Sequence, residues 1–281
     1  MSLVSLLTSA RICFLALLAA LIVSLHFGAT GAWADNDATQ DAGKLHQVRL
    51  NTVSRVMRGP FDYEEPVGRF PHYEFRHRLL NRSYHAFSGA PSGIDQPRPT
   101  VLLLHGSGRT GLSMVDMWRR VASTHGLVVI APNSARSGGW MLLLDSPGFF
   151  DAVLRHAEQN YPIDRERLFV FGHSAGAVYA TQLAQDNALN ARAVAAHAGY
   201  PERIARRPDE AGPPVGFFLG QYDHLFPPSD LPAIGQAMAA NGHDVTLAFL
   251  PNHSHWYYAD GPAINAEVWR FFKRYGRSQR Q

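Results

Sequence analysis

Short, continuous apolar runs recur along the chain from about residue 100 onward. The first three are Val101 to Leu104, Leu127 to Ala131 and Leu168 to Phe171. A half-exposed strand alternates apolar and polar residues, whereas a run that is apolar throughout predicts a strand buried on both faces. Three later runs share this character: 193–196, 215–219 and 245–250. The pattern therefore predicts a sheet that is covered on both sides.

Segments with helical spacing separate these runs. Apolar residues recur three and four positions apart in 114–121, 150–157 and 264–275, a helix-compatible segment follows from Ala175, and another spans 231–240. Alternating strands and helices are typical of the α/β class, with a mainly parallel central sheet and helices on both faces. The interval between the strand at 193–196 and the turn after the strand at 215–219 is too short for a large cap domain. Without an internal repeat or linker, residues 46–281 are predicted to form a single domain.

The N-terminal part of the chain has a different pattern. Residues 12–25 are strongly apolar, and Ala32-Trp33-Ala34 offers the small residues that signal peptidase requires. Residues 1–34 are therefore predicted to be a secretory signal peptide, with an uncleaved membrane anchor as the alternative. Residues 35–45 are polar and are predicted to be a flexible leader. Alternation in 72–77 suggests one or two antiparallel edge strands before residue 95.

Composition narrows the function classes. The chain has 281 residues, 46% of them hydrophobic, and a formal net charge of +3 without a basic run interleaved with aromatics. This excludes a disordered protein and makes nucleic acid an unexpected partner. The single cysteine, Cys13, lies in the predicted signal segment. Disulfides, thiol catalysis and cysteine metal sites are therefore not expected in the mature chain.

The clearest chemical signal follows the apolar run that ends at Phe171. The next five residues are Gly172-His173-Ser174-Ala175-Gly176, a G-x-S-x-G motif between a predicted strand and a predicted helix. In that context the serine sits on a tight turn, and the residues two before and two after it must lack a side chain that would collide with the neighbouring elements. Ser174 is therefore the candidate nucleophile; the alternative is an ordinary capping serine in a glycine-rich turn.

A serine nucleophile needs a base and an orienting carboxylate, which in this arrangement follow it in the order acid, then histidine. Asp223 lies just past the strand at 215–219, and Asp230 is a weaker candidate because it resembles a helix start. The strand at 245–250 leads into a loop with two histidines, His253 and His255, either of which is a candidate base. A metal pair at these histidines is not expected because no third ligand with suitable spacing accompanies them.

Acyl transfer also needs backbone donors for a developing oxyanion. The strand at 101–104 ends in His105-Gly106-Ser107-Gly108, a turn of small residues. We predict that the N–H groups of Ser107 and Ala175 form the oxyanion hole, with Gly108 as the alternative to Ser107. Five aromatic residues on nearby loops are candidates either for an apolar floor of the site or for core packing: Trp140, Tyr200, Tyr222, Phe226 and Trp256.

These motifs, together with the stretch from Tyr161 to Arg167, resemble the α/β-hydrolase superfamily. Within it, residues 98–275 resemble the secreted esterases grouped with polyhydroxybutyrate depolymerases and feruloyl esterases. The resemblance implies that an ester acylates Ser174, that Asp223 orients the base, and that water then hydrolyses the acyl-enzyme. The likeness of His255-Trp-Tyr-Tyr258 to the histidine-plus-aromatics ending of such esterases favours His255 over His253 as the base.

The sequence thus predicts a secreted or periplasmic serine esterase of the α/β-hydrolase fold. Its expected substrates are short-chain, aromatic or hydroxyalkanoate-type esters, as small molecules or oligomers, and no cofactor or metal is expected. A serine peptidase or an acyltransferase with the same triad is the first alternative, and a binding protein on a catalytically lapsed scaffold is the second. After signal cleavage, no stable membrane association is expected, and the oligomeric state is left open.

Overall fold

The computed structural model describes residues 43–50, 62–90, 96–205 and 211–276. All of these residues belong to one compact unit, Gln40–Gln281. The predicted signal peptide at 1–34 and most of the predicted leader at 35–45 lie outside the described residues.

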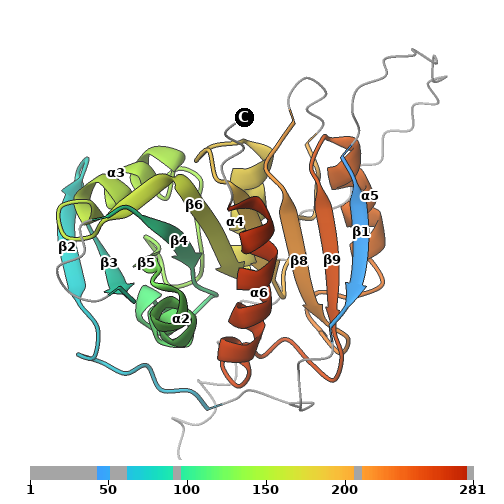
Figure 1. The fold of residues 1–281 in the computed structure, drawn as a ribbon, viewed down its shortest axis with the longest axis horizontal. Coiled ribbons are helices and arrows are strands. Elements are labelled where there is room, and N and C mark those ends of the chain that lie inside the picture. Colours follow the sequence, from blue (N-terminus) through green and yellow to red (C-terminus); the bar gives the residue numbers. More distant parts are fainter. Residues whose placement is uncertain (1–42, 51–61, 91–95, 206–210, 277–281) are drawn as a thin grey trace, which may run out of the picture. The chain divides into compact units, whose positions relative to one another are not determined.

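Nine strands in the described part of the chain form one sheet, in the order β1-β9-β8-β7-β6-β4-β5-β3-β2 (Figure 1). In chain order they are β1 (Leu45–Arg49), β2 (His72–His77), β3 (Leu80–Ser88), β4 (Arg98–Leu104), β5 (Val128–Pro132), β6 (Ile163–His173), β7 (Ala193–His197), β8 (Val215–Gly220) and β9 (Val245–Leu250). All pairs from β1 through to β5 are parallel, whereas β3 pairs antiparallel with both β5 and β2. The predicted mainly parallel sheet with an antiparallel edge is confirmed.

Helices cover both faces of this sheet. They are α2 (Gly111–His125), α3 (Pro147–Ala157), α4 (Ala175–Gln185), α5 (Leu231–Ala240) and α6 (Gly261–Tyr275). Helices α2 and α6 lie on the face that is turned toward the viewer in Figure 1. Apolar residues of α3, α4 and α5 pack into a separate cluster on the opposite face. Each predicted helix is therefore present.

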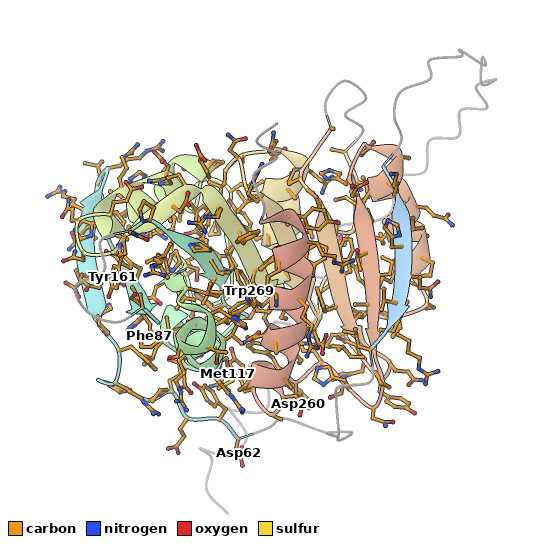
Figure 2. All side chains as sticks on the ribbon, in the orientation of Figure 1. Asp62, Phe87, Met117, Tyr161, Asp260 and Trp269 are labelled. Atoms are coloured by element: carbon orange, nitrogen blue, oxygen red, sulfur yellow. The ribbon has the colours of Figure 1, made fainter. Side chains whose placement is uncertain are left out.

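Strand residues alternate between these two cores. Leu102 and Leu104 of β4 pack in the cluster with α3 and α4, whereas Leu103 packs with α2 and α6. Successive side chains of a strand point to opposite faces, so a strand that is buried on both faces needs apolar residues at every position. Met117 of α2 and Trp269 of α6 belong to the second core and are labelled in Figure 2.

The end of the predicted leader differs in the structure. Leu45, which the polar composition assigns to the leader, is the first residue of β1 and pairs with Val245 of β9. The side chains of β1 are exposed, so apolar periodicity carries no signal for this strand. Backbone pairing with β9 holds it instead. Just before the strand, the amide of Gly43 donates to the carbonyl of Ala239 at 2.9 Å and the amide of Lys44 donates to Asp244 Oδ1 at 3.0 Å.

The described residues between β7 and β8 form no helix, in agreement with the predicted lack of a large cap; residues 206–210 lie outside the description. Across the parts of the chain that the structure describes, none of the helices has the length and apolarity needed to cross a membrane.

Candidate active site

Ser174 lies at a sharp turn between β6 and α4. Its φ of 53° and ψ of −120° are strained for a residue with a side chain. A Cβ at Gly172 would overlap the carbonyl oxygen of Gly176, and a Cβ at Gly176 would overlap that of Leu104. The amide of Ser174 donates to the carbonyl of His197 at 3.0 Å. Two glycines and a bond to β7 therefore hold the strained turn, which gives the G-x-S-x-G spacing its steric reason.

Three predicted site residues form one hydrogen-bonded series. Ser174 Oγ lies 3.0 Å from His255 Nε2, and His255 Nδ1 lies 3.0 Å from Asp223 Oδ2 and 3.2 Å from its Oδ1. Ser174 follows β6, Asp223 follows β8 and His255 follows β9, so the three side chains meet where neighbouring parallel strands end. Asp223 and His255 are almost completely buried. The arrangement matches a nucleophile, a base and an orienting carboxylate.

The surroundings of Asp223 keep its carboxyl ionised. Burial alone would raise its pKa, but the hydrogen bond and charge of His255 and the amides of Phe226 and Leu225 hold the pKa below its ordinary value. Both amides donate to Asp223 Oδ1 at 2.9 Å. An ionised Asp223 accepts the Nδ1 proton of His255, which leaves Nε2 free to receive a proton from Ser174.

The alternative base and the alternative acid, His253 and Asp230, bind other residues and not the group around Ser174. His253 Nε2 lies 3.1 Å from His197 Nε2, so this ring faces β7 and not Ser174. Asp230 is the N-cap residue of α5, and its Oδ2 accepts from the hydroxyl of Tyr200 at 3.3 Å. Of the four candidates for acid and base, the structure brings Asp223 and His255 to Ser174.

The predicted oxyanion donors come from two turns that lie close together. A Cβ at Gly139 would lie 3.4 Å from Ala175 Cβ and 3.8 Å from Ser107 Oγ, so the turn after β4 and the start of α4 approach each other around this glycine. The amide of Gly108 already donates to the carbonyl of Ser137 at 2.7 Å. Because this bond already uses the N–H of Gly108, it favours the N–H of Ser107 as the oxyanion donor. Its role and that of Ala175 stay predictions.

The aromatic residues near the site divide into two groups. Phe226 stacks on the ring of His255 with centroids 6.0 Å apart, and Trp256 meets the same ring edge-on at 5.8 Å. Trp140 is half-buried and donates from Nε1 to the carbonyl of His105 at 2.8 Å. Tyr200 is buried and packs on Phe226, whereas Tyr222 is exposed. Phe226 and Trp256 therefore border the ring of His255, and Tyr200 packs against Phe226.

Sequence reasoning missed an ion pair that holds the loops around the site. Arg82 of β3 binds Asp145, and both side chains are buried. Asp145 also accepts from the amides of Ala135 and Met141, at 3.0 and 2.8 Å. These bonds fix the segment that carries Trp140 next to the turn after β4. Neither Arg82 nor Asp145 belongs to a sequence motif. Arg82 also donates to the carbonyl of Leu144, which lies 62 positions further along the chain.

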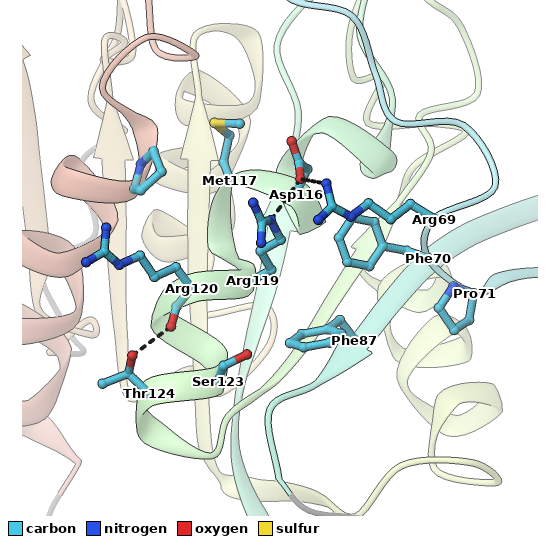
Figure 3. Close-up of a pocket in the computed structure, with 11 residues that line it drawn as sticks. Arg69, Phe70, Pro71, Phe87, Asp116, Met117, Arg119, Arg120, Ser123 and Thr124 are labelled. Carbon is cyan, nitrogen blue, oxygen red and sulfur yellow. Dashed lines mark hydrogen bonds and ion pairs between the residues drawn. The ribbon is translucent and has the colours of Figure 1, made fainter.

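A surface pocket of about 760 Å³ lies beside α2 (Figure 3), and Ser174 is not among the residues that line it. Phe70 and Phe87 line it together with charged residues of α2. Asp116 binds Arg119 at 3.1 Å and approaches Arg69 at 3.9 Å, so its carboxylate is paired with two arginines. Within the described ranges, no group of three or more His, Cys, Asp or Glu side chains is arranged to hold a metal ion.

Comparison with known proteins supports this picture. Residues 145–273, which contain Ser174, Asp223 and His255, match the Dienelactone hydrolase family. A search of curated proteins found no matching sequence. The fold is similar to that of a thermostable esterase (20% identity, TM-score 0.57), covering 74% of this chain and 63% of that one.

Two further solved structures are similar over nearly their whole length. They are an S-formylglutathione hydrolase from Staphylococcus aureus (16% identity, TM-score 0.58, 72% of this chain and 98% of that one) and a ferulic acid esterase (17%, 0.58, 74% and 98%). The predicted resemblance to the α/β-hydrolase superfamily is confirmed at the level of the fold. The family match and these neighbours support a hydrolase, while the narrower likeness to polyhydroxybutyrate depolymerases stays a prediction.

Proposed function

We propose that this protein is a serine hydrolase that cleaves carboxylic esters through an acyl-enzyme on Ser174. The observation that carries the proposal is the hydrogen-bonded series from Ser174 Oγ through His255 to Asp223. A serine hydroxyl is a poor nucleophile at neutral pH unless a neighbouring base removes its proton. The strained turn exposes that hydroxyl, and Asp223 holds His255 in the tautomer that accepts the proton.

The reaction proceeds in two halves. His255 Nε2 takes the proton of Ser174 as its Oγ attacks the ester carbonyl, and the N–H groups of Ser107 and Ala175 bind the oxyanion. The bond to the alkoxy group then breaks, and the leaving alcohol takes the proton from His255. In the second half, His255 removes a proton from water, the resulting hydroxide attacks the acyl carbon, and Ser174 leaves with that proton. The products are an alcohol and a carboxylic acid.

The surroundings of His255 suggest the substrate class. Phe226 and Trp256 are apolar, lie against the base and are partly exposed. Aromatic faces contribute to the binding of flat or aliphatic groups. The expected substrates are therefore short aliphatic, hydroxyalkanoate-type and aromatic esters. The ferulic acid esterase among the structural neighbours agrees with the aromatic alternative.

The experiment is ester hydrolysis by the mature protein and its Ser174→Ala variant. We expect turnover of p-nitrophenyl acetate and butyrate, and a loss of about 10⁶-fold in kcat for the variant. A fluorophosphonate probe should label Ser174 in the wild-type protein, as located by mass spectrometry. Turnover of amides or acyl transfer to an added alcohol, without ester hydrolysis, would favour a peptidase or an acyltransferase. Absence of both labelling and turnover contradicts the proposal.

We further propose that the protein acts outside the cytoplasm. The support is the sequence of residues 1–34, with its apolar run and the Ala32-Trp33-Ala34 site. The test is expression of the full chain, followed by fractionation and N-terminal sequencing. A mature form beginning at Asp35 in the periplasm or medium is expected, whereas an intact N-terminus in the membrane fraction would show an uncleaved anchor.

A further inference from the structure

Three buried imidazoles lie in series beside the site. His173 Nδ1 is 3.0 Å from His197 Nδ1, and His197 Nε2 is 3.1 Å from His253 Nε2. At the far end, His253 Nδ1 lies 3.5 Å from Oδ2 of Asp260, the N-cap residue of α6. We call His173, His197 and His253 the imidazole chain. The reaction described above uses none of its members.

The imidazole chain lies directly against the triad. The ring of His173 is 5.4 Å from the ring of His255, centroid to centroid. His173 precedes Ser174 in the sequence, and the backbone carbonyl of His197 accepts the amide of Ser174. The imidazole chain therefore extends from the ring next to His255 to the start of α6.

All three imidazoles are buried, and two of them are held neutral. Burial lowers the pKa of both His173 and His197 well below the ordinary value, and the neighbouring imidazoles lower each further. A neutral imidazole carries one N–H and one bare nitrogen. Each N···N contact in the chain needs one proton, so the tautomers of adjacent rings depend on one another.

Proton counting gives the direction of the chain. Asp260 Oδ2 is buried, accepts no hydrogen bond and lies 3.5 Å from His253 Nδ1. Its negative charge favours an N–H over a bare nitrogen on the ring atom that faces it, so the proton of His253 lies on Nδ1 and its Nε2 is bare. His197 must then donate from Nε2 and accept at Nδ1. His173 must in turn donate from Nδ1, which leaves its own Nε2 bare.

We propose that Asp260 sets the tautomers of the whole imidazole chain and that His173, at its other end, is thereby a positioning residue for the base His255. The N–H dipoles point in series toward Asp260, so the negative end of the chain lies at His173. This end favours the positive charge that His255 acquires when it takes the proton of Ser174. The inference rests on the proposed hydrolase function of the triad.

Other polar groups also face the imidazole chain. His173 stacks on Tyr257 at 5.0 Å and meets Tyr258 edge-on at 5.9 Å, and the charge of Arg109 acts on it. The ring of Tyr257 also lies 5.3 Å from that of His197. Burial raises the pKa of both tyrosines, to about 12 for Tyr258, so they stay neutral. Asp260 shares a surface pocket with Arg120 and His125. Of the groups named here, Asp260 is the one carboxylate, and its contact with His253 places it at the end of the imidazole chain.

The first test is the protonation pattern of the imidazoles. ¹⁵N-histidine labelling of the mature protein, with nitrogen–proton correlation spectra at neutral pH, shows which ring nitrogen carries the proton. We expect Nδ1–H on His173, Nε2–H on His197 and Nδ1–H on His253. A proton on Nε2 of neutral His173 overturns the proposal. Since this measurement needs no turnover, its failure is distinguishable from failure of the hydrolase function.

The second test is the pH profile of ester hydrolysis by the Asp260→Asn variant. Without the carboxylate, His255 should accept a proton less readily, so the acid limb of kcat/KM should move to lower pH by about half a unit, and the plateau kcat should fall about threefold. KM should stay unchanged. An unshifted limb overturns the proposal, because a side chain that only holds the start of α6 in place would alter stability alone. Asp260 makes no side-chain capping bond to α6.

Two further variants complete the experiment. Asp164→Asn is the matched control: the Asp164 side chain is 16% exposed and that of Asp260 is 15% exposed, and Asp164 lies near the start of β6, at the end opposite Ser174. Its acid limb should match that of the wild type. Should Asp260→Asn fail to fold, Asp260→Ser keeps a side chain that caps helices well and removes the charge, with the same expected shift.

Discussion

At the scale of single residues, the close packing of backbone around Ser174 requires glycine at neighbouring positions. A serine at φ 53° is strained by about 1–3 kcal/mol. The surrounding backbone holds this conformation only if it approaches closely on both sides, which the absence of a Cβ at Gly172 and Gly176 allows. The same close approach explains Gly106, where a Cβ would lie 3.3 Å from that of Ser174.

Substitution of these glycines should have unequal effects. Gly172→Ala places a Cβ on the carbonyl of Gly176, a backbone atom that cannot move aside, and should destabilise the fold by several kcal/mol. Gly138→Ala is the control, because a Cβ there has no neighbour within 4 Å. Urea unfolding of both variants checks this. Equal stabilities would show that the turn relaxes without cost.

The carboxylate of Asp223 should raise kcat because it is charged and because both of its oxygens can accept the Nδ1 proton of His255. Asp223→Asn leaves the shape intact but allows the wrong tautomer of His255, so kcat for a p-nitrophenyl ester should fall by about 10⁴-fold. Thermal unfolding at neutral pH should show a folded variant. A loss below tenfold would mean that Asp223 does not orient the base.

The same variant makes a pH prediction. Because the folded pKa of Asp223 lies below its unfolded value of about 3.9, its stabilisation is fully present above that value and is lost as the pH falls through the folded pKa. The wild-type protein should therefore lose stability more steeply than Asp223→Asn below about pH 4. Urea unfolding at two acid pH values measures the difference, and parallel slopes would contradict it.

At the scale of elements, apolar runs and helical spacing were sufficient to locate the buried strands and helices. The helix at 231–240 and the strand at 245–250 have their predicted bounds. The meeting of Ser174, Asp223 and His255 was also predictable, because strand ends in an α/β sheet bring these side chains together. Exposed β1 was not, since its side chains contact too little of the core to impose a pattern. The imidazole chain and the Arg82–Asp145 pair were missed because no sequence motif marks their members as partners.

The Arg82–Asp145 pair should be essential to the loops that it joins. Arg82→Leu leaves a buried carboxylate without its cation and should cost about 3–5 kcal/mol of unfolding free energy. It should also lower kcat, because Asp145 holds the segment that carries Trp140. Arg155→Leu removes an exposed pair with Asp151 and should cost about 1 kcal/mol or less. Urea unfolding compares the two, and similar losses would refute the structural role.

At the scale of the whole molecule, buried neutral histidines should make the fold sensitive to acid. Burial lowers the pKa of His173, His197 and His243, and that of His85 to about 4. Between these lowered values and the unfolded value of about 6.5, the unfolded chain binds more protons than the folded one. Stability is thus retained above about pH 6.5 and falls as the pH is lowered below it.

The slope of this loss can be assigned to single residues. Each such histidine contributes up to about 1.4 kcal/mol per pH unit, so removing one should flatten the wild-type slope by that amount. We expect this for His197→Gln and, in case that variant does not fold, for His243→Gln, whose ring lies outside the imidazole chain and binds the carbonyl of Pro213 at 2.8 Å. His46→Gln, on exposed β1, should leave the slope unchanged. Urea unfolding at pH 7 and pH 5 gives the slopes. Equal slopes in all variants would mean that the buried rings take up protons as readily in the folded chain as in the unfolded one, which contradicts the prediction.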